Sequence, residues 1–442
     1  MRGIHILFFY LLVVVHNASA AEVDLKKVWQ SIQTDSQAIK AARFDHKASL
    51  EAQSRSEKHW LPQVYLNARA YQTNDPGANF FGLLQQRSVQ ATDFNPATIN
   101  QPGANNYAMG AIGLNLPLYE GGMKANQAEL QNHLSAAKKD TIFHVRNQQY
   151  AAVVQSFGTV ALVEQQRKKL LDLSKNIRKL IKYYKIGSRS NPVGYSGLLG
   201  LKSLANRVDG VLQNYEGQVL AHHAALKQMG FSHQGYWTPH FTNLESYLGQ
   251  ALGVGASESS YFIESLRKQA LVAEKASDME SARYRPQLGV FAETYMFNGD
   301  RKTADGFSAG LYLKWNLFSP DSMGRSSEAQ YRAVSASAHA QAQSQKMLAE
   351  KEGAEKAIQA LRENLKLLES SQNLLDEQVK MARKLFRNGS INALQLTEIL
   401  NRRIDMISQQ TDLSLMLLSH SASNILNSKF EIPQTIAGVD RK

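Results

Sequence analysis

Two groups of residues in this sequence could form a site: a pair of adjacent histidines, and the polar residues around two glycines that interrupt long helical tracts. His222 and His223 are neighbours, so they cannot share one helix face as metal ligands spaced i,i+4 do. The sequence has no His-Glu-x-x-His, no phosphate-binding loop ending in Lys-Ser or Lys-Thr, and no Gly-x-Ser-x-Gly. We therefore predict that the protein is not an enzyme and has no catalytic residue, metal or cofactor.

The two glycines occupy matching places in the chain. Gly187 lies in Tyr-Lys-Ile-Gly-Ser, and Gly389 lies in Phe-Arg-Asn-Gly-Ser, 202 residues later. Each ends a proline-free tract with the three-and-four spacing of a coiled-coil seam. The seam positions are Val163, Gln166, Leu170, Leu173, Ile177, Leu180 and Tyr184, then Leu361, Leu365, Leu368, Gln372, Leu375, Val379, Ala382 and Phe386. We predict two helical hairpins with these glycines at their tips.

Four segments with alternating apolar and polar residues precede the long tracts in pairs, as β-hairpins would. They are Val64 to Tyr71, Tyr107 to Leu118, Leu288 to Tyr295 and Phe307 to Leu317. The segment 72–106, rich in Asn, Gly and Pro, is predicted to be a long loop. Each half of the chain thus reads as helix, hairpin, long helix, tip and helix, which indicates a tandem duplication.

Composition and the chain ends suggest the division into domains. Residues 1–20 have a basic start, a short apolar run and Ala-Ser-Ala, as a signal peptide does. We predict a first repeat at 21–229, a compact insert at 230–258, a second repeat at 259–430 and a polar tail at 431–442. The chain lacks cysteine, and its formal charge of +12 comes without a nucleic-acid-binding motif, so we expect no nucleic-acid partner.

The strands have the length and the two-faced pattern of strands that cross a bilayer. Strands in lipid leave no open edges, and four are too few to close a barrel, so several chains must share one. The long helices would then form a hollow cylinder whose far end carries the tips. Trp60 and Trp315 lie near the helix-proximal ends of strands, where an interfacial aromatic belt is expected. The alternative is a periplasmic coiled-coil adaptor or structural protein without a pore, which would not need the strands.

The chain resembles the outer-membrane efflux, or TolC, family. The resemblance rests on two Pro-Gln-(Val/Leu) strand starts, the Leu-Tyr-Glu-Gly-Gly and Leu-Phe-Ser-Pro junctions, and the two tips. It implies a mainly α protein with a membrane β-barrel: a homotrimer with a twelve-stranded barrel, an α-helical tunnel and an equatorial domain near 230–258. It implies a place in the outer-membrane lipid of a Gram-negative bacterium, extending into the periplasm.

The family also implies a function and partners. Its members are passive exit ducts for multidrug efflux or type I protein secretion, and they work with a periplasmic adaptor and an inner-membrane efflux pump or ABC transporter. The implied periplasmic tip or gate comprises Tyr184, Gly187, Ser188, Arg189, Phe386, Gly389, Ser390, Gln395 and Glu398. Relatives carry aspartates after the tip glycine, whereas Gln395 and Glu398 hold the matching positions here. The Tyr-x-x-Gly-x-Arg pattern occurs only in the first tip, and the second has Phe386 and Ile391 instead.

Overall fold

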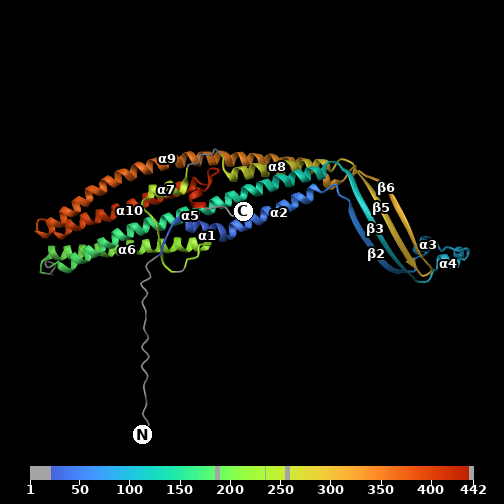
Figure 1. Cartoon of the computed structure of the whole chain (residues 1–442), viewed down its shortest axis with the longest axis horizontal. Helices are drawn as coiled ribbons and strands as arrows, with labels where there is room; N and C mark the ends of the chain where they lie inside the picture. Colours follow the sequence, from blue (N-terminus) through green and yellow to red (C-terminus); the bar gives the residue numbers. More distant parts are fainter. Residues whose placement is uncertain (1–20, 185–189, 234, 254–258, 438–442) are drawn as a thin grey trace, which may run out of the picture. The chain divides into compact units, whose positions relative to one another are not determined.

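The computed structural model describes residues 21–184, 190–233, 235–253 and 259–437, and these are mainly helical (Figure 1). Two helices dominate, α5 (Met123–Tyr183) with 61 residues and α9 (Arg325–Arg387) with 63. The other α-helices of the described residues are α1 (Leu25–Asp35), α2 (Gln37–Glu57), α3 (Pro76–Gln85), α4 (Pro96–Asn100), α6 (Pro192–Met229), α7 (Leu244–Leu252), α8 (Tyr261–Ala282), α10 (Ala393–Ser423) and α11 (Gln434–Ala437). Short 3-10 helices are η1 (Ala91–Phe94) and η2 (Pro320–Ser322). None of the helices described is long and apolar enough to cross a membrane.

The strands form one four-stranded antiparallel sheet in the order β2-β3-β5-β6, together with a short parallel pair. The four are β2 (Gln63–Thr73), β3 (Asn105–Glu120), β5 (Gln287–Gly299) and β6 (Thr303–Lys314), and the short pair is β1 (Ala21–Val23) with β4 (Trp237–Pro239). Strand β6 ends at Lys314, so Trp315 and Leu317 lie beyond the strand that was predicted to include them.

The register of the sheet brings the predicted apolar faces of all four strands together. Leu66 pairs with Ile112, Ile112 with Thr294, and Thr294 with Phe307. Directly paired residues point to the same side of an antiparallel sheet, so this row continues one face. That face is uncovered in the chain: Leu66 is 75% exposed, Leu311 71% and Phe307 83%. The sheet therefore has an apolar surface that this chain alone leaves in contact with its surroundings.

The opposite face carries polar and aromatic side chains. The Tyr65 hydroxyl donates a hydrogen bond of 2.8 Å to Glu293, and its ring lies over Gly113 on the strand between them. A Cβ atom at Gly113 would lie 2.2 Å from that ring, so the contact needs glycine. Tyr312 over Gly289 and Tyr295 over Gly306 repeat the arrangement. Aromatic rings placed over strand glycines fix the register of this face.

The connection between β2 and β3 is folded, and the prediction of a long loop over 72–106 is wrong. Asp75 caps α3 by accepting a hydrogen bond of 2.6 Å from the Ala78 backbone, and Pro76 occupies the first turn. Asn95 and Pro96 begin α4 in the same way. These are strong helix-start signals that the overall Asn, Gly and Pro content of the segment obscured. We call residues 74–104 the cap.

An ion pair between a buried aspartate and an exposed arginine holds the cap to the turn between β5 and β6. Arg301 donates to both carboxylate oxygens of Asp93, at 2.7 and 2.6 Å, and the Asp93 side chain is 3% exposed. Gln86, which directly follows α3, accepts hydrogen bonds of 3.0 Å from the backbone N–H groups of Arg301 and Lys302. The guanidinium of Arg301, with the Gln90 backbone N–H, lowers the pKa of Asp93 from 3.8 to about 2.

Replacing Asp93 with Asn should release the cap while the sheet stays folded, because the neutral amide cannot accept both charged donors of Arg301. We expect hydrogen exchange over residues 76–100 to become markedly faster. In the parent protein the carboxylate is charged when folded, so its stabilisation is complete above about pH 4 and is lost as the pH falls through about 2. Exchange that is equally slow in both proteins at neutral pH would show that the ion pair does not hold the cap.

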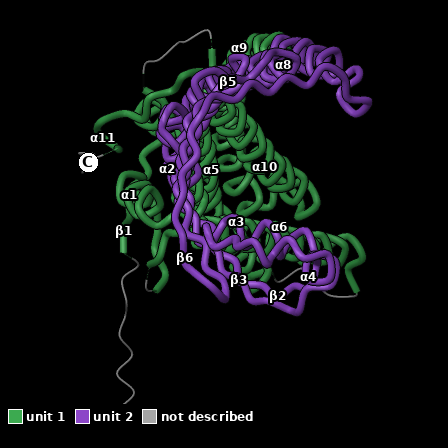
Figure 2. Tube along the Cα trace, turned by 90° about the vertical axis from the view of Figure 1, so that its right-hand side faces the viewer, with its two compact units in different colours: residues 1–42, 141–262, 344–442 green, residues 43–140, 263–343 purple. Residues whose placement is uncertain are grey.

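The described chain forms two compact units, drawn in green and purple in Figure 2. One comprises residues 43–140 and 263–343, which include the sheet and the cap. The other comprises the described parts of residues 1–42, 141–262 and 344–442, and the described part of the segment 230–258, predicted to be an insert, belongs to it. This second unit has a core in which Trp29, Tyr150 and Phe157 are fully buried. The core is formed by α1, the middle of α5, the insert and the C-terminal segment, residues 417–436.

Candidate functional site

The ends of the long helices form two helical hairpins, α5 with α6 and α9 with α10, packed around a shared core. The predicted seams are buried where they meet α6 and α10: Leu170 and Ile177 are inaccessible, and Leu375, Val379 and Ala382 are also buried. Arg207 of α6 forms an ion pair with Asp405 of α10 and donates a hydrogen bond of 2.9 Å to Asn401. These contacts join the first hairpin to the second.

The second tip is a regular helix end followed at once by a capped helix start. Gly389 has φ +81°, and its N–H and that of Ser390 bond back to Phe386 and Leu385, which closes α9 with a Schellman motif. Asn392 then begins α10, where its side chain and that of Gln395 bond each other's backbone N–H at 3.0 Å. Gln395 therefore acts here as a capping residue.

The two tips meet through their aromatic residues. Tyr184 and Phe386, which occupy equivalent places in the two repeats, stack with ring centroids 6.0 Å apart and an interplanar angle of 18°. The sequence marked both residues, and the structure brings them together. Three other predicted tip residues, Gly187, Ser188 and Arg189, lie outside the described residues.

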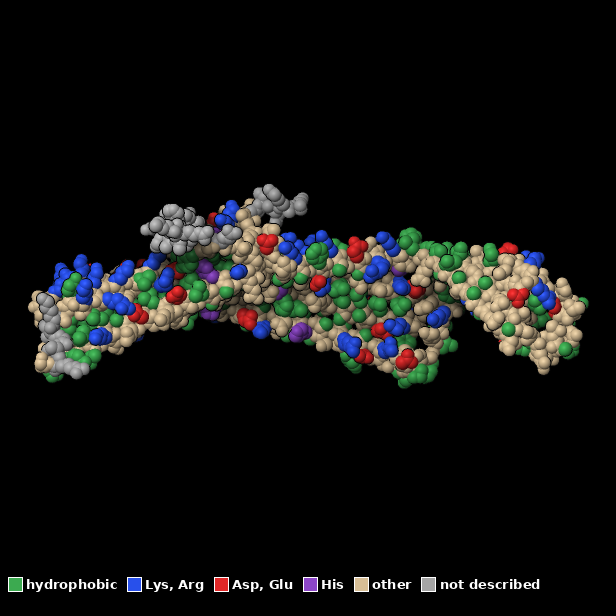
Figure 3. All heavy atoms as spheres, turned by 90° about the horizontal axis from the view of Figure 1, so that it is seen from below, with side chains coloured by type: hydrophobic (Ala, Val, Ile, Leu, Met, Phe, Trp, Pro, Cys, Tyr) green, Lys and Arg blue, Asp and Glu red, His purple; other side chains and the backbone are tan. Residues whose placement is uncertain are grey.

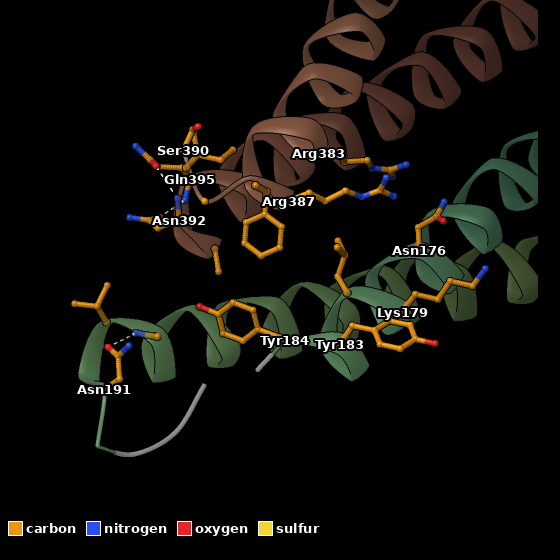
Figure 4. Close-up of a pocket in the computed structure, with 17 residues that line it drawn as sticks. Asn176, Lys179, Tyr183, Tyr184, Asn191, Arg383, Arg387, Ser390, Asn392 and Gln395 are labelled. Carbon is orange, nitrogen blue, oxygen red and sulfur yellow. Dashed lines mark hydrogen bonds between the residues drawn. The ribbon is translucent and has the colours of Figure 1, made fainter. Parts of the chain in front are cut away.

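A pocket of about 910 Å³ opens between the hairpins around this aromatic pair. Figure 4 shows Arg383 and Arg387 extending from α9 across the pocket from Lys179 and Tyr183 of α5. Phe386, Gly389, Ser390 and Gln395, all predicted tip residues, also line it. The three cations Lys179, Arg383 and Arg387 were not among the predicted tip residues. A signal was present in the sequence, because residues 168–183 carry six Lys or Arg and one Asp, and residues 380–387 carry four Lys or Arg and no acidic residue.

The remaining predicted residues lie elsewhere. Glu398 is on the exposed side of α10, where it pairs with Arg402 at 3.3 Å, and it does not line the pocket. Trp60 precedes β2 and is 63% exposed. Trp315 directly follows β6, is 54% exposed, and donates its indole N–H to the Tyr284 carbonyl at 3.1 Å. Both tryptophans thus lie outside the ends of the strands, with most of their surface free.

Helix α6 approaches the start of α10 closely at Gly197. A Cβ atom there would lie 2.6 Å from the Ala393 Cβ and 3.0 Å from the Tyr184 hydroxyl. We expect Gly197→Ala to destabilise the tips by about 1–3 kcal/mol through overpacking. Gly210→Ala, on the same helix with open space around it, should instead stabilise by about 0.5–1 kcal/mol. Thermal unfolding of both variants checks this, and a gain in stability at both positions would contradict the close packing.

No protein-family model matches this sequence, and no curated protein matches it significantly. The fold, however, is that of outer-membrane channel proteins, and the predicted resemblance to the TolC family is confirmed in fold. The outer membrane protein VceC from Vibrio cholerae is similar over 92% of this chain and 97% of its own, with a TM-score of 0.75 and 15% identity. The CmeC outer membrane channel of Campylobacter jejuni matches over 92% and 86%, with a TM-score of 0.75 and 11% identity. The open state of the MtrE outer membrane channel of Neisseria gonorrhoeae matches over 91% and 88%, with a TM-score of 0.70 and 10% identity.

Proposed function

We propose that this protein is an outer-membrane channel, a passive duct whose strands span the outer membrane of a Gram-negative bacterium and whose helices extend into the periplasm. The observation that carries the proposal is the four-stranded sheet with one exposed apolar face and one polar face. A bilayer would cover the apolar face, and a water-filled lumen would suit the polar face. The similarity of nearly the whole chain to outer-membrane channels supports the same function.

The sheet also favours a barrel shared by several chains, and we propose that the assembly is a homotrimer. Within the described residues, β2 and β6 each pair with a neighbour on one side only. Unpaired backbone groups in hydrocarbon cost several kcal/mol each, so both edges need partner strands. Pairing β2 of one chain with β6 of the next in a ring of three would give a closed barrel of twelve strands. The long helices would continue it as a tunnel, and the 230–258 insert would form the equatorial domain between the repeats 21–229 and 259–430.

Passive conduction through such a tunnel needs a source of energy and substrate elsewhere. We propose that an inner-membrane efflux pump or ABC transporter supplies both through a periplasmic adaptor that docks at the tips, in multidrug efflux or type I secretion. The tip residues Tyr184, Gly187, Ser188, Arg189, Phe386, Gly389, Ser390, Gln395 and Glu398 would form the docking and gating end. Trp60 and Trp315 would lie at the membrane interface.

The test is single-channel conductance of the detergent-purified protein in a planar bilayer, with the mass of the assembly measured in the same preparation. We expect a trimer that conducts. A protein that stays soluble without detergent and does not conduct would instead fit the coiled-coil adaptor, and would overturn the channel.

A further inference from the structure

We propose that the pocket between the two tips binds a small aromatic anion, a flat apolar molecule that carries a carboxylate or sulfonate group. This inference rests on the proposed function and deepens it, because a ligand bound at the tips of a channel would indicate the class of substrate that the channel conducts.

The charge of the pocket selects an anion. Its described lining residues include Lys179, Arg383 and Arg387 but neither Asp nor Glu. In the part of the chain that the structure describes, none of these three cations lies within 4.0 Å of a carboxylate. Lys and Arg side chains, coloured blue in Figure 3, also gather toward the tips at the left of that view. Guanidinium groups bind carboxylates with two parallel hydrogen bonds, so the cations have donors to offer a ligand.

Helix stability explains only part of this charge. Arg387 lies in the last turn of α9, where a cation stabilises the helix by interacting with the free carbonyl groups at its C-terminal end. Lys179 and Arg383 lie about one turn before the ends of α5 and α9. They therefore precede the last turns, in which that effect is concentrated. Arg383 is half-buried, and this burial lowers its pKa, as do the neighbouring cations Arg403 and Arg387, whereas Asp376, which pairs with Arg403 at 2.9 Å, acts in the opposite direction. An incoming anion would relieve the repulsion between Arg383 and Arg387, which have no carboxylate partner within 4.0 Å among the described residues.

The apolar part of the ligand is selected by rings. Tyr184 and Phe386 stack in the pocket, and Tyr183, which is 72% exposed, lines it on the α5 side. An aromatic ligand could stack on these side chains while its anionic group reaches Arg383 or Arg387. The volume of about 910 Å³ lies in the range of pockets that hold small organic molecules.

The test is isothermal titration of the detergent-purified full chain with 2-naphthoate, 2-naphthamide and 2-naphthylmethylammonium, which share a ring system and differ in charge. We expect the anion to bind about tenfold or more tightly than the amide, because it gains charged hydrogen bonds, and the cation to bind weakest. Arg387→Gln and Lys179→Gln should each weaken naphthoate binding by about tenfold. Lys384→Gln removes the same charge from the same turn of α9 but lies outside the pocket lining, so binding should change less than about twofold.

Equal binding of the three probes would show that the pocket does not select an anion. Equal weakening by Lys384→Gln and Arg387→Gln would show a general effect of charge and no binding in the pocket. Conductance of the same preparations separates this result from failure of the channel proposal. A protein that conducts but does not prefer naphthoate refutes the pocket alone. A protein that prefers naphthoate but does not conduct refutes the channel alone.

Discussion

Arginine in place of Phe307 is expected to abolish assembly of the protein in a bilayer. Phe307 is 83% exposed and lies in the row formed with Leu66, Ile112 and Thr294, which crosses the strands near the middle of their length. If lipid covers this face, a guanidinium near the bilayer centre costs about 2–4 kcal/mol in each chain. That corresponds to about a 30- to 900-fold loss of the inserted form, and more if several chains share one barrel. Flotation of the refolded protein with liposomes measures the inserted fraction.

The adjacent residue provides the matched control. Ser308 is also exposed, but it points to the opposite face and pairs with Glu293. An arginine there would lie beside a carboxylate on the polar side of the sheet, so Ser308→Arg should insert as well as the parent protein. Equal insertion of Phe307→Arg and Ser308→Arg would show that lipid does not cover the apolar face, and would contradict the bilayer-spanning sheet.

The faces of the sheet could be predicted from the sequence because they depend on a period of two that is local to each strand. The alternation in Val64 to Tyr71 and in Phe307 to Lys314 fixes which residues share a face, and the register confirms it. The long helices could also be predicted from the sequence, since heptad spacing and the absence of proline extend over many turns. Tyr184 and Phe386 were marked as equivalent by the duplication, and their stacking follows from the packing of two similar hairpins.

The attachment of the cap to the sheet and the cationic pocket depend on contacts that no local pattern contains. Asp93 and Arg301 are 208 residues apart, and both are residue types that usually lie on the surface. Only the fold brings them together and buries the Asp93 carboxylate. Lys179 and Arg383 likewise come from different repeats, and only the packing of the hairpins places them around one pocket. Charged side chains on a helix are usually solvated, so their number near the tips was visible but their convergence was not.

Alanine in place of Tyr150 is expected to give the largest loss of stability in the unit that carries the tips. The Tyr150 ring is inaccessible, packs edge-on against Trp29 at 5.0 Å and stacks with Phe430 at 5.8 Å. Its hydroxyl donates a hydrogen bond of 2.7 Å to the Ala251 carbonyl of α7. Burial raises the pKa of Tyr150 well above its usual value, so the hydroxyl stays protonated and remains a donor at physiological pH. One side chain thus joins α1, α5, the insert and the C-terminal segment.

Removing such a buried aromatic ring costs about 3–5 kcal/mol, so Tyr150→Ala should lower the thermal unfolding transition followed by far-ultraviolet circular dichroism. Tyr150→Phe keeps the ring contacts and leaves only the Ala251 carbonyl without its donor, which costs about 1–3 kcal/mol. The graded order therefore separates packing from hydrogen bonding. If both variants unfolded at the temperature of the parent protein, the insert would not be held to α5 by this core, and an equatorial domain built on it would lose its physical basis.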